Sequence, residues 1–389
     1  MAISPRRGES VSVLDAPRGR RGFGYVRAAI AAGLLVACGG VEDGAARAVD
    51  AGVPADFAVA DAAVIPDAAV FPDARLRDRD AGADPGPDEV DDAGEPRLGA
   101  PYPIVLAHGF FGFEELGGSF LTYFYGVKDD LAAHGETVFT PAVDPFNDST
   151  SRGEELAAAV DAILAETGHA KVVLVGHSQG GLDARYVAST RPDQVAAVVT
   201  VSSPHRGTPM IDLVLRAAED ERVREWVDGL VRTVGAPLWD AAGEETSLFH
   251  AMEQLSEEGA AAFNAAHPNQ PGVDYFSIAG RSGMHLAPGP CASDEAPEWI
   301  TRYAWERDPI DPLLAVSEAF IDGGFGDPYP NDGLVRIESA RWGTFLGCVP
   351  ADHFDEMGQL LGDSPGLGNR WSYLEFYRDL VGWVRAEGY

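Results

Sequence analysis

The chain has 389 residues, enough for one large α/β domain with appended segments. Lys and Arg together number 29 and Asp and Glu 61, which gives a formal net charge of -32 at pH 7. A charge this negative repels phosphate backbones and anionic lipid surfaces. It therefore argues against nucleic acid as a partner and favours binding of a divalent cation.

The first segment, residues 1–37, is expected to be an export signal of the bacterial lipoprotein type. A basic stretch precedes an apolar run, 28–37, that is too short for an ordinary transmembrane helix. Small residues then lead into Cys38, the position that lipoprotein processing acylates. Gly39 follows in place of the Asp that favours inner-membrane retention, so an outer-membrane or cell-surface anchor is expected. A plain secretory signal with an incidental cysteine is the alternative, and it also implies export.

The next segment, residues 38–98, is rich in Ala, Asp and Pro and has no sustained hydrophobic period. Such a composition buries too little apolar surface to offset the entropy of ordering, so we predict a disordered tether. Globular composition begins at about residue 99. Residues 99–389 are therefore expected to form one globular domain.

This domain alternates apolar runs with helical patterns. Runs typical of buried strands lie at 102–107, 138–140, 171–175, 196–201 and 275–278, and helical patterns at 154–166, 181–190 and 371–384. The alternation predicts an α/β fold with a mostly parallel, doubly wound sheet. Residues 207–268 show only helical patterns, which we interpret as an inserted helical cap or lid. Ordinary scaffold helices are the alternative there.

The strongest motif follows the strand expected at 171–175. Gly176-His-Ser-Gln-Gly180 fits the pattern G-x-S-x-G, with a β-branched strand entering it and a helix leaving it. This context is that of a nucleophile elbow, in which a tight turn lifts the serine hydroxyl above the sheet. Ser178 is therefore the predicted nucleophile. A glycine-rich turn without a catalytic role is the alternative.

A serine hydroxyl needs a base, and the base needs an orienting acid. In elbow-bearing folds these residues follow the serine in the order acid, then histidine. His353 is the only histidine after Asp332, which lies in a turn-forming Asn-Asp-Gly stretch. We predict Asp332 and His353 as acid and base. The rival acids are Asp311, Asp322 and Asp327.

The tetrahedral intermediate requires two backbone donors. One is expected to be the N–H of Gln179, directly after the nucleophile. The other is expected to be the N–H of Phe110, in the loop after the first strand. His108, beside that loop, is interpreted as a structural hydrogen-bonding residue.

The chain contains three cysteines. With Cys38 assigned to the anchor, Cys291 and Cys348 remain as an even pair in an exported domain, which makes a disulfide plausible. Two free buried thiols are the alternative.

Several motifs together resemble one family. They are Tyr102-Pro-Ile-Val-Leu-Ala-His-Gly109 with Phe110-Phe-Gly-Phe113, the Gly176-His-Ser-Gln-Gly-Gly181 elbow with Asp183-Ala-Arg-Tyr186, Ser203-Pro-His-Arg-Gly207, Asn331-Asp-Gly-Leu-Val335 and His353-Phe-Asp-Glu356. In combination they resemble the bacterial triacylglycerol lipases of the Pseudomonas and Burkholderia type, over roughly residues 100–363. The resemblance implies an α/β-hydrolase fold with a mobile helical lid and hydrolysis of medium- and long-chain triacylglycerols at lipid interfaces. Many relatives also depend on a dedicated foldase.

The resemblance further implies a structural Ca²⁺ beside the loop that bears the catalytic histidine. By the family pattern the ligands would be Asp355, Gln359, the carbonyl of Asp363 and an acidic residue of an Asp-Pro segment. Asp311 matches that last position best and Asp308 is a close second. Oxygen ligands suit Ca²⁺, although acidic residues that are merely solvated are the alternative. Cys291 fits the family's first disulfide position, whereas Cys348 lies nearer the histidine than the usual partner.

The predicted reaction is ester hydrolysis through an acyl-enzyme at Ser178. Alternatives on the same core are a carboxylesterase for soluble substrates, a phospholipase and an acyltransferase. From another class, the chain could be a catalytically silent surface lipoprotein that binds lipids or a partner.

Overall fold

The computed structural model describes residues 97–110, 122–217, 247–283, 291, 293, 296–312, 314–322, 329–359, 362, 365–366 and 368–389. The predicted signal segment, the acylated Cys38 and nearly all of the predicted tether lie outside these residues. Among the described helices, none is long and apolar enough to cross a membrane.

The described core is a six-stranded sheet in which every neighbouring pair of strands is parallel. Its strands are β1 (Ile104–Ala107), β2 (Val138–Phe139), β3 (Val172–His177), β4 (Val195–Val201), β5 (Asp274–Gly280) and β6 (Thr344–Val349), in the spatial order β2-β1-β3-β4-β5-β6. All residues of β1, β3 and β4 are buried. Runs of Val, Leu and Ile can form such strands because both faces of a parallel sheet are covered by helices.

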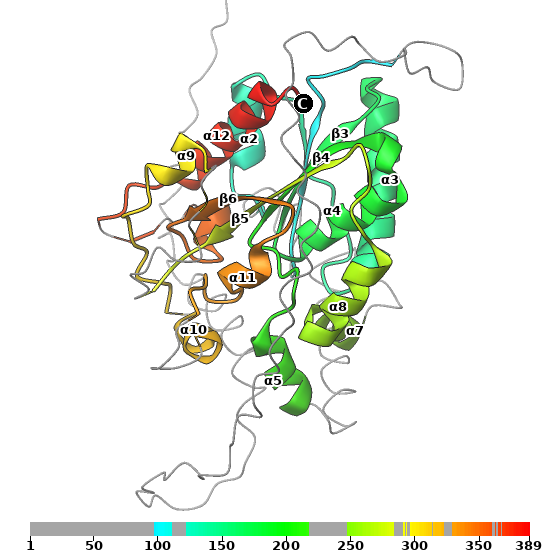
Figure 1. Ribbon diagram of the computed structural model, residues 1–389. Coiled ribbons are helices and arrows are strands. Elements are labelled where there is room, and N and C mark those ends of the chain that lie inside the picture. The colour runs from blue at the N-terminus through cyan, green and yellow to red at the C-terminus, as the bar shows by residue number, and fades with distance from the viewer. Residues whose placement is uncertain are drawn as a thin grey trace, which may run out of the picture. The chain divides into compact units, whose positions relative to one another are not determined.

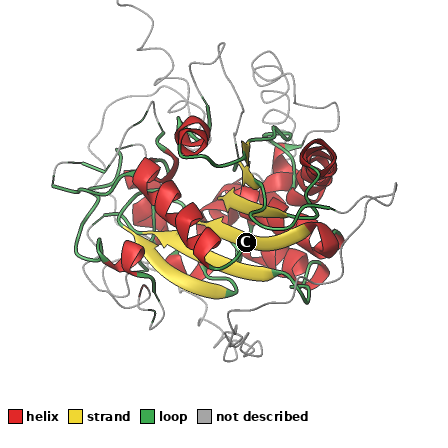
Figure 2. Ribbon diagram, turned by 90° about the horizontal axis from the view of Figure 1, so that it is seen from above, coloured by secondary structure: helices red, strands yellow, loops and turns green. Residues whose placement is uncertain are grey.

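Helices cover the two faces of the sheet (Figures 1 and 2). On one face the apolar stripes of α3 (Ser149–Thr167) and α4 (Gln179–Thr190) pack on alternate residues of β1, β3 and β4. On the other face α2 (Val127–Ala133) and α12 (Tyr373–Ala386) pack on the remaining residues of the same strands. This arrangement confirms the predicted doubly wound sheet.

Further helices lie in the connections. They are η2 (Pro192–Gln194), α5 (Pro209–Ala217), α7 (Leu248–Leu255), α8 (Glu257–Ala266), α9 (Glu298–Thr301), α10 (Ala315–Ile321), α11 (Ile337–Ala340) and η5 (Asp355–Met357). Helices α5, α7 and α8 fall within 207–268, between β4 and β5, where an inserted helical segment was expected. The stretch 218–246 of that segment lies outside the described residues.

Candidate active site

Ser178 lies at the junction of β3 and α4 in a strained backbone conformation. Its φ is 55° and its ψ is -130°, a region that residues other than glycine rarely adopt. Its N–H donates to the carbonyl of Val201 at 2.9 Å, which fixes the turn to β4. His177 and Gln179 on either side are buried, whereas Ser178 is partly exposed. The turn therefore presents the serine and hides its neighbours.

The two flanking glycines are required by backbone contacts. A Cβ on Gly176 would lie 2.4 Å from the carbonyl oxygen of Gly180, and one on Gly180 would lie 2.1 Å from that of Ala107. Real Cβ atoms do not approach backbone oxygens this closely. The G-x-S-x-G pattern is therefore a packing requirement of strand, turn and helix at this point.

His353 and Asp332 are brought together from two loops at the carboxyl ends of the strands. Nδ1 of His353 lies 2.8 Å from Oδ2 of Asp332, and both side chains are buried. The backbone N–H of His353 also donates to the backbone carbonyl of Asp332 at 2.9 Å. Since a carboxylate oxygen accepts hydrogen bonds, the proton of the neutral imidazole lies on Nδ1, and Nε2 is the acceptor.

The acid is itself held by backbone donors. Oδ1 of Asp332 accepts the N–H groups of Leu334 and Val335 at 2.9 and 2.7 Å. The carboxylate thus has one oxygen committed to its own turn and the other to the imidazole. Its orientation is fixed before any substrate binds.

His177, directly before Ser178, packs against His353 with ring centroids 4.6 Å apart. Its Nε2 lies 2.9 Å from Oε2 of Glu356, and its Nδ1 lies 2.8 Å from the Tyr123 hydroxyl. Burial lowers the pKa of His177 well below its usual value, and the nearby His353 lowers it further. Burial also raises the pKa of Glu356, with a further contribution from Asp332. Burial therefore disfavours the charged form of both members of the His177–Glu356 pair.

The loop after β1 lies directly against the serine. A Cβ on Gly109 would lie 2.4 Å from the Tyr123 hydroxyl and 2.7 Å from Cβ of Ser178. Phe110 follows Gly109, and Gln179 follows Ser178 as the first residue of α4, where the N–H groups have no partner within the helix. Both predicted oxyanion donors therefore lie next to this close contact.

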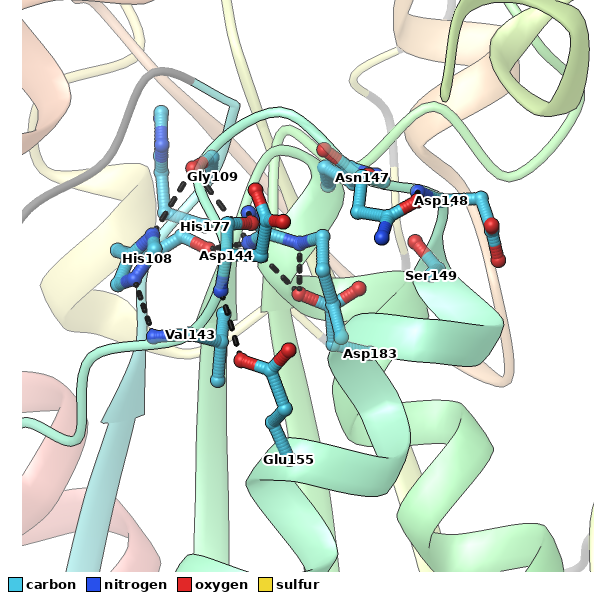
Figure 3. A network of polar contacts seen from close by, with 12 residues as sticks. His108, Gly109, Val143, Asp144, Asn147, Asp148, Ser149, Glu155, His177 and Asp183 are labelled. Atoms are coloured by element: carbon cyan, nitrogen blue, oxygen red, sulfur yellow. Dashed lines mark hydrogen bonds and ion pairs between the residues drawn. The ribbon is translucent and has the colours of Figure 1, made fainter. Parts of the chain in front are cut away.

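A buried arginine on α3 organises the same loop. Arg152 donates to the carbonyl of His108 at 2.6 Å, to that of Asp144 at 2.7 Å and to Oδ2 of Asp183 on α4 at 2.8 Å. Figure 3 shows this network of polar contacts from close by. Because the guanidinium is fully buried, its charge must be balanced within the protein, and Asp183 supplies the opposite charge.

This arginine also orients the peptide that bears the Phe110 N–H. The carbonyl oxygen of Gly109 lies 3.5 Å from Nη2 of Arg152. A trans peptide directs its C=O and N–H to opposite sides, so the Phe110 N–H points away from Arg152. His108 takes part only structurally: its Nε2 accepts the Val143 N–H at 3.1 Å, and burial, aided by Arg152, lowers its pKa to about 3.

Three buried carboxylates form a possible cation site beside the His353 loop. The carboxylate oxygens of Asp308, Asp352 and Asp355 lie within 4.8 Å of one another. Burial, with a contribution from Asp352, raises the pKa of Asp308 to about 7. Burial also raises the pKa of Asp352, to about 6. Oδ2 of Asp308 is buried and has no hydrogen-bond partner, so this set of oxygens fits a hard cation.

Asp311, Gln359 and Asp363 were also expected at the cation site. Asp311 meets the cluster through its backbone, whose N–H donates to Oδ2 of Asp352 at 2.8 Å. The Gln359 side-chain nitrogen donates to the carbonyls of Thr122 and Tyr123 at 2.7 and 2.6 Å. Asp363 lies outside the described residues. The described cluster thus joins Asp355 to Asp308, the second candidate of the Asp-Pro segment, and the nearby Asp311 helps to raise the pKa of Asp308 and Asp352.

A disulfide joins Cys291 and Cys348, with an S–S distance of 2.12 Å and a sequence separation of 57. Cys348 is in β6, which leads into the loop bearing His353. The bridge therefore fastens the strand from which the histidine loop departs.

Three residues of the site were not found by sequence reasoning. Arg152 carries no motif, because an arginine in an amphipathic helix is usually solvated. Asp352 adjoins His353 in the sequence, but its place in a cluster of carboxylates is visible only from its spatial neighbours Asp308 and Asp355. Glu356 belongs to a motif that was recognised, but its contact with His177 spans 179 positions.

Comparisons with known proteins agree with this geometry. A family model described as the alpha/beta hydrolase fold matches residues 102–280. The triacylglycerol lipase of Vibrio cholerae serotype O1 is 36% identical over 279 residues, which cover 67% of this chain and 81% of that protein. The triacylglycerol lipase of Pseudomonas fragi is 30% identical over 286 residues, covering 71% of this chain and 93% of that protein. In fold, the crystal structure of Staphylococcus hyicus lipase is similar at a TM-score of 0.53 and 18% identity, covering 74% of this chain and 96% of that one.

Proposed function

This chain belongs to the triacylglycerol lipase family, and from that premise we propose that it hydrolyses medium- and long-chain lipid esters with Ser178, His353 and Asp332 as catalytic triad. The hydroxyl oxygen of Ser178 attacks the ester carbonyl, and His353 Nε2 takes its proton. The same imidazole then protonates the departing alcohol. Water, activated by His353, releases the fatty acid from the acyl-enzyme.

The polar groups around the serine have separate roles in this proposal. The N–H groups of Phe110 and Gln179 bind the oxyanion that forms on the carbonyl oxygen. Asp332 keeps the His353 proton on Nδ1 and stabilises the imidazolium. His177 packs against the imidazole, and because burial lowers its own pKa it adds no positive charge to oppose protonation of His353.

One observation supports this mechanism above the others. Ser178 occupies a strained elbow. The ring of its neighbour His177 packs, tilted, against the imidazole of His353 with centroids 4.6 Å apart, and Asp332 holds that imidazole at 2.8 Å. These contacts support a site in which the three residue types needed for acyl transfer act together. A structural role for this arrangement would not require the serine to be strained and accessible.

Covalent labelling tests the proposal. A fluorophosphonate is expected to modify one residue, Ser178, because only an activated serine attacks it at a useful rate. Mass spectrometry of the labelled peptide identifies the site, and labelling should abolish hydrolysis of p-nitrophenyl palmitate in proportion. A protein that stays unlabelled and inactive would instead be a silent surface lipoprotein. Labelling without any activity on insoluble esters would favour a soluble-substrate esterase.

Calcium is part of the proposed function as a structural ion. Asp308, Asp352 and Asp355 would hold it, and Gln359 and Asp363 stay predictions from the family pattern. When bound, the ion would supply positive charge to three buried carboxylates and fasten the loop that carries His353. No catalytic step passes through it.

Removal of calcium is expected to destabilise the domain. At a free concentration about 100 times Kd, an ion that binds only the folded state contributes about 2.7 kcal/mol, or roughly 5–10 °C in Tm. Thermal unfolding with Ca²⁺ and with EGTA measures this difference. Asp308→Asn should abolish it, whereas Asp193→Asn, at an exposed residue of η2, should retain it. A Tm that does not respond to EGTA in the wild type would contradict the site.

The N-terminal segments contribute location rather than chemistry. Export through residues 1–37, acylation of Cys38 and assistance by a foldase rest on sequence patterns alone. With these features the enzyme would act while anchored at the cell surface or outer membrane. The remaining alternatives, a phospholipase and an acyltransferase, share the same triad and differ in the ester they accept.

A further inference from the structure

The short turn 146–149, between β2 and α3, contacts both candidate oxyanion residues. The ring of Phe146 packs edge-on against that of Phe110, with centroids 6.2 Å apart and an interplanar angle of 87°. The carbonyl of Asn147 accepts the side-chain N–H of Gln179 at 2.8 Å. One turn therefore supports both predicted oxyanion residues, Phe110 and Gln179.

The same turn receives a contact from the inserted helices. Oε1 of Gln254, on α7, accepts the backbone N–H of Ser149 at 2.5 Å. Ser149 begins α3, where Asp148 already accepts the N–H groups of Thr150 and Ser151. Gln254 thus supplies the remaining cap of this helix end from a position 105 residues away.

Helix α7 is also held in place by apolar packing, in addition to the hydrogen bond of Gln254. Its Leu255 is buried with Leu182 and Tyr186 of α4 and with Phe263 of α8. The backbone that carries Gln254 is therefore anchored on the helix that begins at Gln179. The hydrogen bond from Ser149 to Gln254 thus links this anchored helix to the turn.

The inner side of the turn is already fixed. Asp144 donates its N–H to Glu155 at 2.8 Å, its carbonyl accepts from Arg152, and its Oδ1 accepts the Phe146 N–H at 2.9 Å (Figure 3). These bonds hold the segment before Phe146 but leave Asn147 and Ser149 to other partners. Gln179 bonds to the Asn147 carbonyl, and Gln254 bonds to the Ser149 N–H.

We propose that Gln254 is a positioning residue for the oxyanion hole, acting through the 146–149 turn. Through it the inserted helices set the placement of Phe110 and Gln179. The inference rests on the proposed function, because it takes those two residues as the oxyanion donors. It assigns to the described helices of the insertion a role of their own, beside the lid role expected from the family resemblance: the position of α7 affects how well the transition state is bound.

The test compares Gln254→Ala with the conservative Gln254→Glu, which keeps an acceptor oxygen at the same reach. For Gln254→Ala we expect kcat on p-nitrophenyl butyrate to fall about tenfold, a fraction of the 10²–10³-fold loss that follows removal of a whole donor. KM should change less than about twofold, because ground-state contacts are untouched. Gln254→Glu should keep kcat near the wild-type value.

An alkylboronic acid supplies a readout that a purely structural cap would not move. Its boron accepts the Ser178 oxygen and places a boron-bound oxygen where the oxyanion forms. Its inhibition constant should rise in Gln254→Ala by the same factor as kcat falls. Glu253→Gln, at an exposed position of the same helix, serves as the matched control and should change neither quantity.

The outcomes separate this inference from the proposed function. Loss of boronate binding in Ser178→Ala, with binding in the wild type, would support the function whatever Gln254 does. Unchanged kcat and boronate affinity in Gln254→Ala would overturn the positioning role, as would equal losses in the Ala and Glu variants. If Gln254→Ala does not fold, Phe146→Leu removes the ring contact with Phe110 and must lower kcat and boronate affinity together.

Discussion

Ser178→Ala is expected to lower kcat at least about 10⁵-fold while leaving the fold intact. The nucleophile, its base and its acid act as one unit, so removing the hydroxyl costs nearly the whole benefit of the triad. Alanine keeps the Cβ that already tolerates a φ of 55°, so the elbow is strained to the same degree in both proteins. Ser178 is partly exposed, so removing its small hydroxyl is not expected to leave a buried cavity.

The measurement is kcat on p-nitrophenyl butyrate, together with the free energy of unfolding in urea. We expect unfolding free energies within about 0.5 kcal/mol of each other, as for a surface substitution. Ser189→Ala, later on α4, is the control and should retain full activity. Residual activity above about 1% in Ser178→Ala, measured on protein free of wild-type contamination, would mean that another residue attacks the ester.

Features set by neighbouring residues could be predicted from the sequence. The elbow is such a feature, because Gly176 and Gly180 are required by contacts within a strand–turn–helix unit. The predicted strands and helices also occur, with ends that differ by a few residues. Strand β6 was missed because Gly347, with φ 129°, interrupts its apolar pattern. The left-handed conformation that glycine permits there carries no periodicity signal.

Contacts between distant segments were beyond sequence reasoning. Chain order suggested Asp332 and His353, but spacing could not decide between Asp308 and Asp311, because loop conformation determines which carboxylate faces Asp355. Arg152 is informative only when the carbonyls around it are seen. A buried guanidinium bonded to backbone oxygens leaves no pattern in a single sequence.

Asp332→Asn is expected to lower kcat about 10³–10⁴-fold by reversing the tautomer of His353. The carbonyl oxygen of the new amide must accept from Leu334 and Val335, as Oδ1 does now. The amide NH₂ then faces Nδ1 of His353, which becomes an acceptor, so the proton moves to Nε2. A protonated Nε2 cannot take the proton of Ser178.

The amide still bonds to the imidazole and to both backbone donors, so the loss of activity should come without a large loss of stability. Activity is measured as kcat, and the tautomer by nitrogen NMR of the imidazole. Asp322→Asn removes a rival acid of the sequence analysis and should leave kcat unchanged.

If Asp332→Asn kept more than about a tenth of the activity, a second carboxylate would have to orient His353. Glu356 is placed for this, but its oxygens already bond to His177 and Ser202, at 2.9 and 2.6 Å. Reorienting it would break both contacts in a fully buried site, and such breaks cost more than a single new bond returns. The buried His177–Glu356 pair therefore favours a large effect of Asp332→Asn.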